Sequence, residues 1–188
     1  MQGYFAIGAI VVLITLLIVR VQLLKRRGIK AVRFGALDKS DYALPPVFVL
    51  FIYFILAEVF DWPRISGVFF FESEFFRWVG VALCAAGLTL FLFSLLSFGT
   101  SFRIGIDNQK PDLLITTGVF AYSRNPIYTA FAALLLGIFL IFPNYIFFCY
   151  FVGAAVLFHR QVLREETFLL SCYGEEYAAY CKKVRRYL

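Results

Sequence analysis

Charged residues are scarce in this sequence: they make up 16% of its 188 residues, whereas 62% are hydrophobic. The mean hydropathy is correspondingly high, at +0.82. A soluble domain carries about 45–50% apolar residues, and a chain of this length cannot bury many more than that. The shortage of charge therefore excludes the ordinary soluble classes and indicates an integral membrane protein.

Side chains that bind transition metals are also few. The sequence has a single histidine, His159, and four cysteines that show no CxxC spacing and share no obvious loop: Cys84, Cys149, Cys172 and Cys181. A zinc or haem site needs clustered Cys or His ligands, so we predict that this protein holds no metal. The net charge of +6 comes from basic residues at the ends of apolar runs. That placement indicates membrane orientation and argues against a nucleic-acid partner.

The N-terminal apolar run lacks the basic residues that precede the apolar core of a signal peptide. No small-residue cleavage site follows it, and its positive charges, Lys25-Arg26-Arg27, come after the run. We therefore expect a retained transmembrane helix whose N-terminus lies outside.

Apolar runs predict five membrane spans. Three cover residues 1–24, 43–60 and 77–98, and two shorter ones lie within 126–158 on either side of Phe142-Pro143-Asn144-Tyr145. About 20 apolar residues cross the ~30 Å of hydrocarbon in a bilayer. The Pro-Asn interruption is typical of a tight helical hairpin. The sequence thus predicts an all-α, integral membrane helical bundle of about five transmembrane helices with cytoplasmic C-terminal helices.

Loop charges predict the orientation of this bundle. Positive residues gather in loops 25–42 and 99–125 and in the tail 159–188. Residues 61–76, in contrast, contain a single basic residue, Arg64. The positive-inside rule then gives an outside N-terminus and a cytoplasmic C-terminus, and we expect the cytoplasmic (inner) membrane. In the tail, Gly174 predicts the end of a helix that covers Glu165–Tyr173. A second helix follows from the apolar stripe of Tyr177, Tyr180, Cys181 and Val184.

Three polar clusters exceed what a bundle needs for anchoring. The first is Gly99–Asp107 and the second is Leu114–Tyr128. The third combines Arg164–Glu166, Tyr173–Tyr177 and Val184–Arg186. Arg124 and Asn125 precede a helix that begins with Pro126, and helix-start N–H groups together with a guanidinium can hold an anion. Gly118 permits a backbone turn or the close approach of a ligand. The carboxylates of Glu165 and Glu166 are able to accept hydrogen bonds from amino or ribose groups.

Each of these residues also has a simpler interpretation. Arg124 could extend along apolar surface to reach water at the membrane interface. Glu165 and Glu166 could mark a helix N-terminus, and the tyrosines could form an aromatic belt. His159 is interpreted as an interface residue. Glu58 lies near the outer end of the second span, where we expect its carboxylate to reach water.

The second and third clusters together resemble the isoprenylcysteine carboxyl methyltransferase and phospholipid methyltransferase family of integral membrane enzymes. That family's pattern is approximately T-x-G-P-[YF]-x-x-x-R-[HN]-P-x-Y, a hydrophobic hairpin, then E-E-x-x-L, [FY]-G-x-x-Y-x-x-Y and V-x-R. The matching residues span roughly Gly99 to Leu188 and are Thr116 or Thr117, Gly118, Phe120, Arg124-Asn125-Pro126, Tyr128, Glu165-Glu166, Leu169, Tyr173-Gly174, Tyr177, Tyr180, Val184 and Arg186. Two positions depart from the pattern. Val119 replaces the usual proline, and Asn125 stands where many members have histidine, which removes an imidazole for proton transfer.

The resemblance implies an S-adenosylmethionine-dependent methyltransferase that acts on a lipidic or small hydrophobic acceptor: an isoprenylcysteine-like carboxylate, a phospholipid amine or a thiol. It implies one membrane domain, 1–188, in which three N-terminal spans (1–98) precede a cofactor-binding loop, helical hairpin and C-terminal helices (99–188). The implied catalytic residues are Arg124 and Glu166. The implied cofactor contacts are Gly118, Tyr122, Arg124, Asn125, Pro126, Tyr128, Glu165 and Glu166. An NADPH-dependent reductase related to sterol reductases and a non-catalytic membrane protein are the alternatives.

Glu165 and Glu166 are expected to differ in role, because adjacent helical residues project about 100° apart. Glu166 shares a face with Leu163, Leu169 and Leu170. A carboxylate in an apolar stripe is costly without a partner. We therefore expect Glu166 to pair with the cofactor or with an arginine such as Arg124. Replacement of Arg124 by alanine is expected to weaken cofactor binding far more than folding.

Overall fold

The computed structural model describes residues 1–26, 28, 44–63, 69–98 and 114–188. The first polar cluster, Gly99–Asp107, and most of the basic loop 25–42 lie outside these residues. The helices are α1 (Gln2–Arg26), α2 (Leu44–Phe60), α3 (Glu74–Phe98), the short 3₁₀ helix η3 (Gly118–Ala121), α4 (Pro126–Ile141), α5 (Tyr145–Tyr173) and α6 (Glu175–Lys183). The described residues thus confirm the all-helical class.

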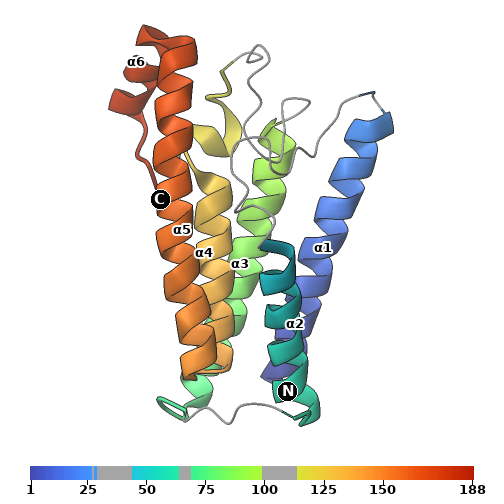
Figure 1. Cartoon of the computed structure of the whole chain (residues 1–188). Coiled ribbons are helices and arrows are strands. Elements are labelled where there is room, and N and C mark those ends of the chain that lie inside the picture. Colours follow the sequence, from blue (N-terminus) through green and yellow to red (C-terminus); the bar gives the residue numbers. More distant parts are fainter. Residues whose placement is uncertain (27, 29–43, 64–68, 99–113) are drawn as a thin grey trace.

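The five long helices alternate in direction along the bundle (Figure 1). The N-terminus and the α4–α5 turn lie at one end, which we call the outer end after the orientation that the loop charges predict. The start of α4, η3 and α6 lie at the other, which we call the α6 end. Both of the polar clusters that the structure describes are therefore at the α6 end, and the site must be sought there.

The lengths of the five expected spans are unequal. Helices α1, α3 and α5 are long and apolar enough to cross a membrane, whereas Pro45–Phe60 of α2 and all of α4 are apolar but shorter. The 16 residues of α4 rise about 24 Å, less than the ~30 Å hydrocarbon thickness. A short helix of this kind is accommodated by local thinning of the bilayer or by neighbouring helices.

Helix α5 is longer than the sequence pattern predicts. It runs without a break from Tyr145 to Tyr173, and its 29 residues rise about 44 Å, so its last third extends beyond a ~30 Å hydrocarbon layer. Glu165 and Glu166 lie about two thirds of the way along this helix. The interpretation of the pair as a helix N-terminus is therefore wrong, as is a separate helix that covers Glu165–Tyr173. Gly174, with φ of +54°, does end the helix as predicted.

The turn between α4 and α5 is fixed by Asn144, which is fully buried. Its side-chain oxygen accepts hydrogen bonds from the backbone N–H groups of Ile146 (3.0 Å) and Phe147 (3.2 Å), which caps α5. Its amide nitrogen donates to Glu58 Oε1 at 2.9 Å. The Pro-Asn hairpin is thus confirmed, and the Glu58 carboxylate has a protein partner in addition to any contact with water.

The closest helix contact joins α3 and α4 through glycines. A Cβ atom built on Gly80 would lie 2.5 Å from the backbone oxygen of Gly137, and one on Gly87 would lie 2.9 Å from that of Ala130. Cys84 lies between these two glycines on α3, and a Cβ atom built on Gly137 of α4 would lie 2.7 Å from its Sγ. Such distances are possible only without side chains, so the two backbones pack directly, as small residues allow between membrane helices.

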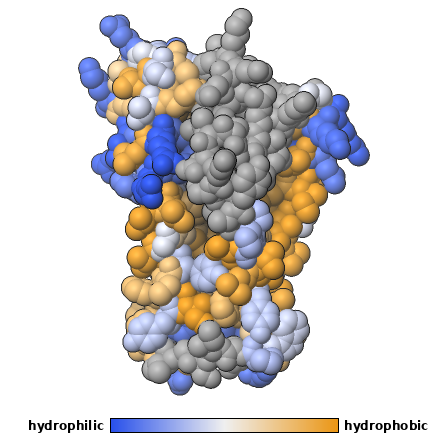
Figure 2. Space-filling view, in the orientation of Figure 1, coloured by the Kyte–Doolittle hydropathy of each residue, from blue (hydrophilic) through white to orange (hydrophobic). Residues whose placement is uncertain are grey.

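The surface of the bundle is apolar around its middle. Large hydrophobic side chains are exposed on α1, α2 and α5, among them Val11, Ile18, Val49, Val152 and Leu157. Figure 2 shows this apolar band, with hydrophilic residues gathered toward the α6 end and at the end of α1. Exposure of so many apolar side chains is costly in water and favourable in lipid, which fits an integral membrane protein.

The α3–α4 contact makes a testable prediction. We expect Gly80→Ala to lower the free energy of unfolding by about 1–3 kcal/mol, because its methyl group must push two helix backbones apart. Gly8→Ala in α1 is the matched control, since a Cβ there meets nothing within 4 Å. Alanine favours helix over glycine, so the control should be neutral or stabilising. Thermal unfolding of the two variants in detergent measures both effects, and equal stability would contradict the close packing.

Candidate functional site

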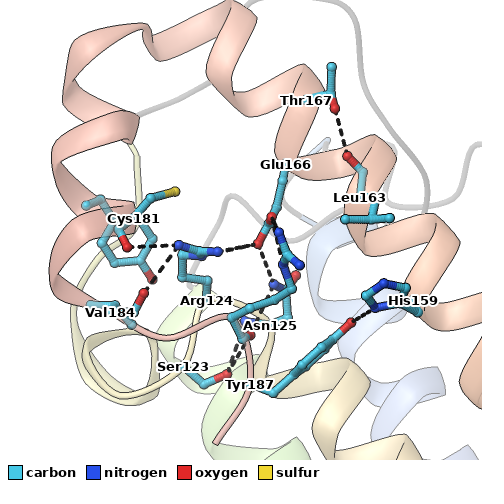
Figure 3. Close-up of polar contacts among 12 residues, drawn as sticks. Ser123, Arg124, Asn125, His159, Leu163, Glu166, Thr167, Cys181, Val184 and Tyr187 are labelled. Carbon is cyan, nitrogen blue, oxygen red and sulfur yellow. Dashed lines mark hydrogen bonds and ion pairs between the residues drawn. The ribbon is translucent and has the colours of Figure 1, made fainter.

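Four segments meet at the α6 end of the bundle: η3, the start of α4, the upper part of α5, and the residues that follow α6. Figure 3 shows polar side chains that join the residues just before α4, helix α5 and the residues that follow α6. We call residues Val184–Tyr187 the tail segment. It pairs with the residues before α4 through a bridge between Ser123 and Arg185. The site is thus assembled from parts of the chain that are about 60 residues apart in sequence.

Glu166 lies at the centre of this cluster. Its Oε1 accepts hydrogen bonds from Arg124 Nε (3.1 Å) and Asn125 Nδ2 (3.2 Å), and it forms an ion pair with Arg124 Nη2 at 3.0 Å. Its Oε2 accepts from Arg186 Nε at 3.0 Å and pairs with Arg186 Nη2 at 2.9 Å. The hydrogen bond to this carboxylate raises the pKa of Arg186. Each oxygen of Glu166 is therefore held by its own guanidinium.

Arg124 has further partners within the protein. Its Nη1 donates to the backbone oxygens of Cys181 (3.0 Å) and Val184 (3.3 Å), and its backbone N–H donates to the oxygen of Arg185 (2.9 Å). Its side chain is only 10% exposed. The alternative of an arginine that extends to water at the interface is therefore wrong. The anion that Arg124 holds in this structure is Glu166, which is one of the two partners expected for that glutamate.

Glu165 belongs to a separate, neighbouring group. Its Oε1 accepts hydrogen bonds from the Tyr128 hydroxyl at 2.6 Å and from Gln161 Nε2 at 3.0 Å. Both donors are uncharged, in contrast to the two guanidinium groups on Glu166. The two adjacent glutamates thus face different environments, as the helical geometry predicts. Tyr128 links this group to α4, and its ring packs against Phe158 with centroids 5.6 Å apart.

Among the described residues, the N-cap side chain of α4 does not cap the helix. Pro126 occupies the first turn of the helix, and Asn125 stands at the N-cap position, but the Asn125 side chain makes no capping hydrogen bond. Asparagine usually caps a helix with its side-chain oxygen. In this chain the side-chain nitrogen of Asn125 donates instead to Glu166 Oε1 and to the backbone oxygen of Arg186. In the part of the chain that the structure describes, the Asn125 side chain thus leaves the first-turn N–H groups of α4 uncapped, and a helix start of this kind favours an anionic ligand.

Gly118 is required by the protein's own packing. Its φ is +64°, and a Cβ there would lie 2.3 Å from Ser97 Oγ at the end of α3. The neighbouring Val119 N–H donates to the same oxygen at 3.4 Å. The space beside Gly118, which the sequence suggested for a turn or a ligand, is therefore occupied by the Ser97 side chain. Tyr122, at the end of η3, is 74% exposed and takes no part in the Glu166 cluster.

Other residues in the cluster were not predicted as site residues. Ser123 is fully buried and donates to the backbone oxygen of Arg186 at 3.3 Å. Tyr180 of α6 donates to the oxygen of Phe120 at 2.6 Å, and burial raises the pKa of its hydroxyl to about 12. Arg186 matched the V-x-R pattern and could have been chosen on that signal. The backbone oxygens of Val184, Arg185 and Arg186 leave no trace in a sequence.

Of the predicted site residues, Arg124, Asn125 and Glu166 are thus in direct contact. Tyr128 and Glu165 form the adjoining group, and Pro126 begins the helix between them. Gly118 and Tyr122 lie outside both groups. A separate cavity of about 190 Å³ lies at the outer end, where its lining includes Gln2, Glu58 and Arg77. It is at the opposite end of the bundle from the predicted residues, so we do not assign the site to it.

Comparison with known proteins gives a family match and related enzymes. The model of the phospholipid methyltransferase family matches residues 75–176, which are 102 of the 188 residues. The protein-S-isoprenylcysteine O-methyltransferase of Tribolium castaneum is 27% identical over 143 residues, which cover 70% of this chain and 50% of that protein. The Schizosaccharomyces pombe enzyme of the same name is 34% identical over 91 residues, 46% of this chain and 38% of that protein. This chain thus spans half or less of these relatives.

A similar fold is found in the solved structure of the eukaryotic intramembrane Ras methyltransferase ICMT (isoprenylcysteine carboxyl methyltransferase), with a TM-score of 0.63 and 22% sequence identity. The match covers 88% of this chain and 58% of that one. This similarity supports the membrane helical bundle. The matched family range, 75–176, includes Arg124, Asn125, Glu165 and Glu166 but ends before the tail segment.

The internal contacts of Arg124 change what its replacement should do. We expect Arg124→Ala to lower the free energy of unfolding by roughly 2–4 kcal/mol, because it leaves part of Glu166 and two backbone oxygens without their partner. The earlier expectation that this substitution largely spares folding is revised accordingly. The exposed Arg160 on α5 is the matched control. Thermal unfolding in detergent, combined with limited proteolysis of residues 174–188, measures the effect. An Arg124→Ala protein as stable and as protease-resistant as Arg160→Ala would contradict it.

Proposed function

This chain belongs to the phospholipid methyltransferase family, and on that basis we propose that it is an integral membrane S-adenosylmethionine-dependent methyltransferase. Its methyl acceptor is a lipidic or small hydrophobic molecule. The named relatives are isoprenylcysteine O-methyltransferases, and the family model is that of phospholipid methyltransferases. A carboxylate, an amine and a thiol are therefore all acceptor groups to be tested. None of these relatives or family descriptions favours the reductase alternative.

The observation that carries this proposal is the arrangement around the start of α4. Asn125 and the first turn of α4 present an acceptor oxygen and N–H donors that form no N-cap hydrogen bond with each other among the described residues. Glu165 and Glu166 on α5 face the start of α4. Their hydrogen bonds with Arg124, Asn125 and Tyr128 connect them to that segment. Such a set can hold a zwitterionic amino acid group and a ribose, because it offers donors for a carboxylate and acceptors for amino and hydroxyl groups.

S-adenosylmethionine, when bound, supplies a methyl group on a sulfonium that is already activated for displacement. The task of the protein is therefore to align the two reactants and to exclude water. Alignment alone can contribute ~7–11 kcal/mol in ideal cases. In our proposal Arg124 and Glu166 hold the segment before α4 against α5, so that Asn125 and the helix start keep a fixed position. Gly118, Tyr122 and Pro126 shape the approach to that position.

The two glutamates have different chemical capacities in this scheme. Glu166 is neutralised by two guanidinium groups, which makes it a stable structural anion and a weak proton acceptor. Glu165 is held only by the uncharged donors Tyr128 and Gln161. A carboxylate or thiolate acceptor needs no base. If the acceptor is an amine, Glu165 is the better placed of the two residues to take its proton.

Binding and turnover test the activity directly. We expect detergent-solubilised protein to bind labelled S-adenosylmethionine and not NADPH. Glu166→Gln should abolish methyl transfer, because the neutral amide no longer pairs with Arg124 and Arg186. Glu165→Gln should leave measurable transfer to a carboxylate or thiol acceptor. Equal and mild effects of the two substitutions on turnover would remove α5 from the active site. Binding of NADPH alone would support the reductase instead.

The orientation of the bundle is part of the proposal. Basic residues of the described helices gather at the α6 end, including Lys25, Arg26, Lys182 and Lys183. By the positive-inside rule, this charge supports a cytoplasmic α6 end and an outside N-terminus, and we propose the cytoplasmic (inner) membrane. A reporter fused after Leu188 should be active only in its cytosolic form. Activity of a periplasmic reporter at that position would reverse the topology and move the site away from the cytoplasmic cofactor.

A further inference from the structure

The tail segment contacts α5 at two levels. Arg186 holds Glu166, and the next residue, Tyr187, reaches His159. The Tyr187 hydroxyl lies 2.9 Å from His159 Nδ1, a hydrogen-bonding distance, and the two rings have centroids 6.2 Å apart (Figure 3). Neither residue belongs to the predicted site, and Tyr187 lies beyond the range that the family model matches, residues 75–176. The pair therefore requires an explanation of its own.

Helical geometry explains how one short segment reaches both levels. His159 and Glu166 are seven residues apart on α5, which is two turns or about 10.5 Å along one face. The side chains of Arg186 and Tyr187 point toward these two positions and span that distance between them. The tail segment thus lies along α5, with an anchor at each of two turns.

The other side of the tail segment is attached to the residues before α4. Arg124 donates to the backbone oxygens of Val184 and Arg185, and Ser123 and Asn125 donate to that of Arg186. These bonds hold the backbone of Arg186 and do not themselves fix the position of its side chain. The Arg186 side chain is 38% exposed, and an ion pair with that much exposure contributes little, because its energy is offset by the entropy lost when the side chain is ordered. The anchor at Tyr187 fixes the chain on the far side of Arg186.

We propose that Tyr187 and His159 are positioning residues for the cofactor site: their contact holds Arg186 in place, and through it the second oxygen of Glu166. The inference rests on the proposed function, because the affected ligand is the S-adenosyl cofactor. Neither residue touches the cofactor in this scheme. Their effect on it passes through Arg186 and Glu166, and the coupling between these residues is therefore what must be measured.

A double-mutant cycle on the full chain measures that coupling. We expect Tyr187→Phe and His159→Phe each to weaken the binding of S-adenosylhomocysteine about two- to tenfold in isothermal titration, the range that one hydrogen bond supports. The double variant should bind no more weakly than either single variant, because both remove the same contact. In an Arg186→Gln background, Tyr187→Phe should have no further effect. Tyr145→Phe, at the exposed start of α5 at the outer end, is the matched control and should bind like the wild type.

The possible outcomes separate this inference from the proposed function. Wild-type protein that does not bind S-adenosylhomocysteine contradicts the proposed function and the inference together. If the wild type binds, unchanged affinity of a folded Tyr187→Phe protein overturns the inference alone. Additive losses from Tyr187→Phe and Arg186→Gln also overturn it, because they show that the tyrosine acts independently of Arg186. Thermal unfolding of each variant identifies any loss of affinity that is caused by misfolding.

Discussion

The Glu166 carboxylate, held between the guanidinium groups of Arg124 and Arg186, is the interaction on which the α6 end of the bundle depends. A charge in this position, with 12% of its side chain exposed, is unfavourable unless it is paired and hydrogen-bonded. The pairing requires three separate segments to come together: the residues before α4, the upper part of α5 and the tail segment. Arg124 strengthens the same assembly through backbone oxygens of α6 and the tail. This one anion thus joins the residues before α4, helix α5 and the tail segment.

The membrane part of the bundle gives that assembly a fixed base. Helices α3 and α4 pack backbone to backbone at Gly80, Gly87 and Gly137, so their relative position has little freedom. Near the end of α3, the Ser97 hydroxyl oxygen accepts a hydrogen bond from the Val119 N–H and leaves no room for a side chain at Gly118. These contacts attach η3 to the α3–α4 pair. The segment that carries Arg124 and Asn125 is therefore held at both ends, by η3 on α3 and by the first turn of α4. Precise placement of this kind is what an alignment-based reaction needs.

Much of this architecture could be predicted from the sequence, where a residue type has one dominant physical role. Long apolar runs indicated the spans, Pro143-Asn144 the hairpin and Gly174 the end of α5, because each reflects a local rule. That Glu165 and Glu166 have different surroundings followed from helical geometry, whereas the sequence left open which of them faces the cofactor. The continuity of α5 was missed because Arg160, Arg164 and the two glutamates changed the polarity of the chain. These residues are good helix formers, and polarity alone does not end a helix. The roles of the tail oxygens and of Ser97 depend on tertiary contacts that no local pattern encodes.

Hydrogen–deuterium exchange, measured with and without S-adenosylhomocysteine, tests most directly whether this cluster is the cofactor site. Our account predicts slower exchange on ligand addition in peptides that cover residues 118–128 and 175–187, with little change in α1 and α2. The same ligand should give no protection in a folded Glu166→Gln protein. Protection confined to the outer end of the bundle, or equal protection in wild-type and Glu166→Gln protein, would contradict the assignment of the cofactor site to the Glu166 cluster.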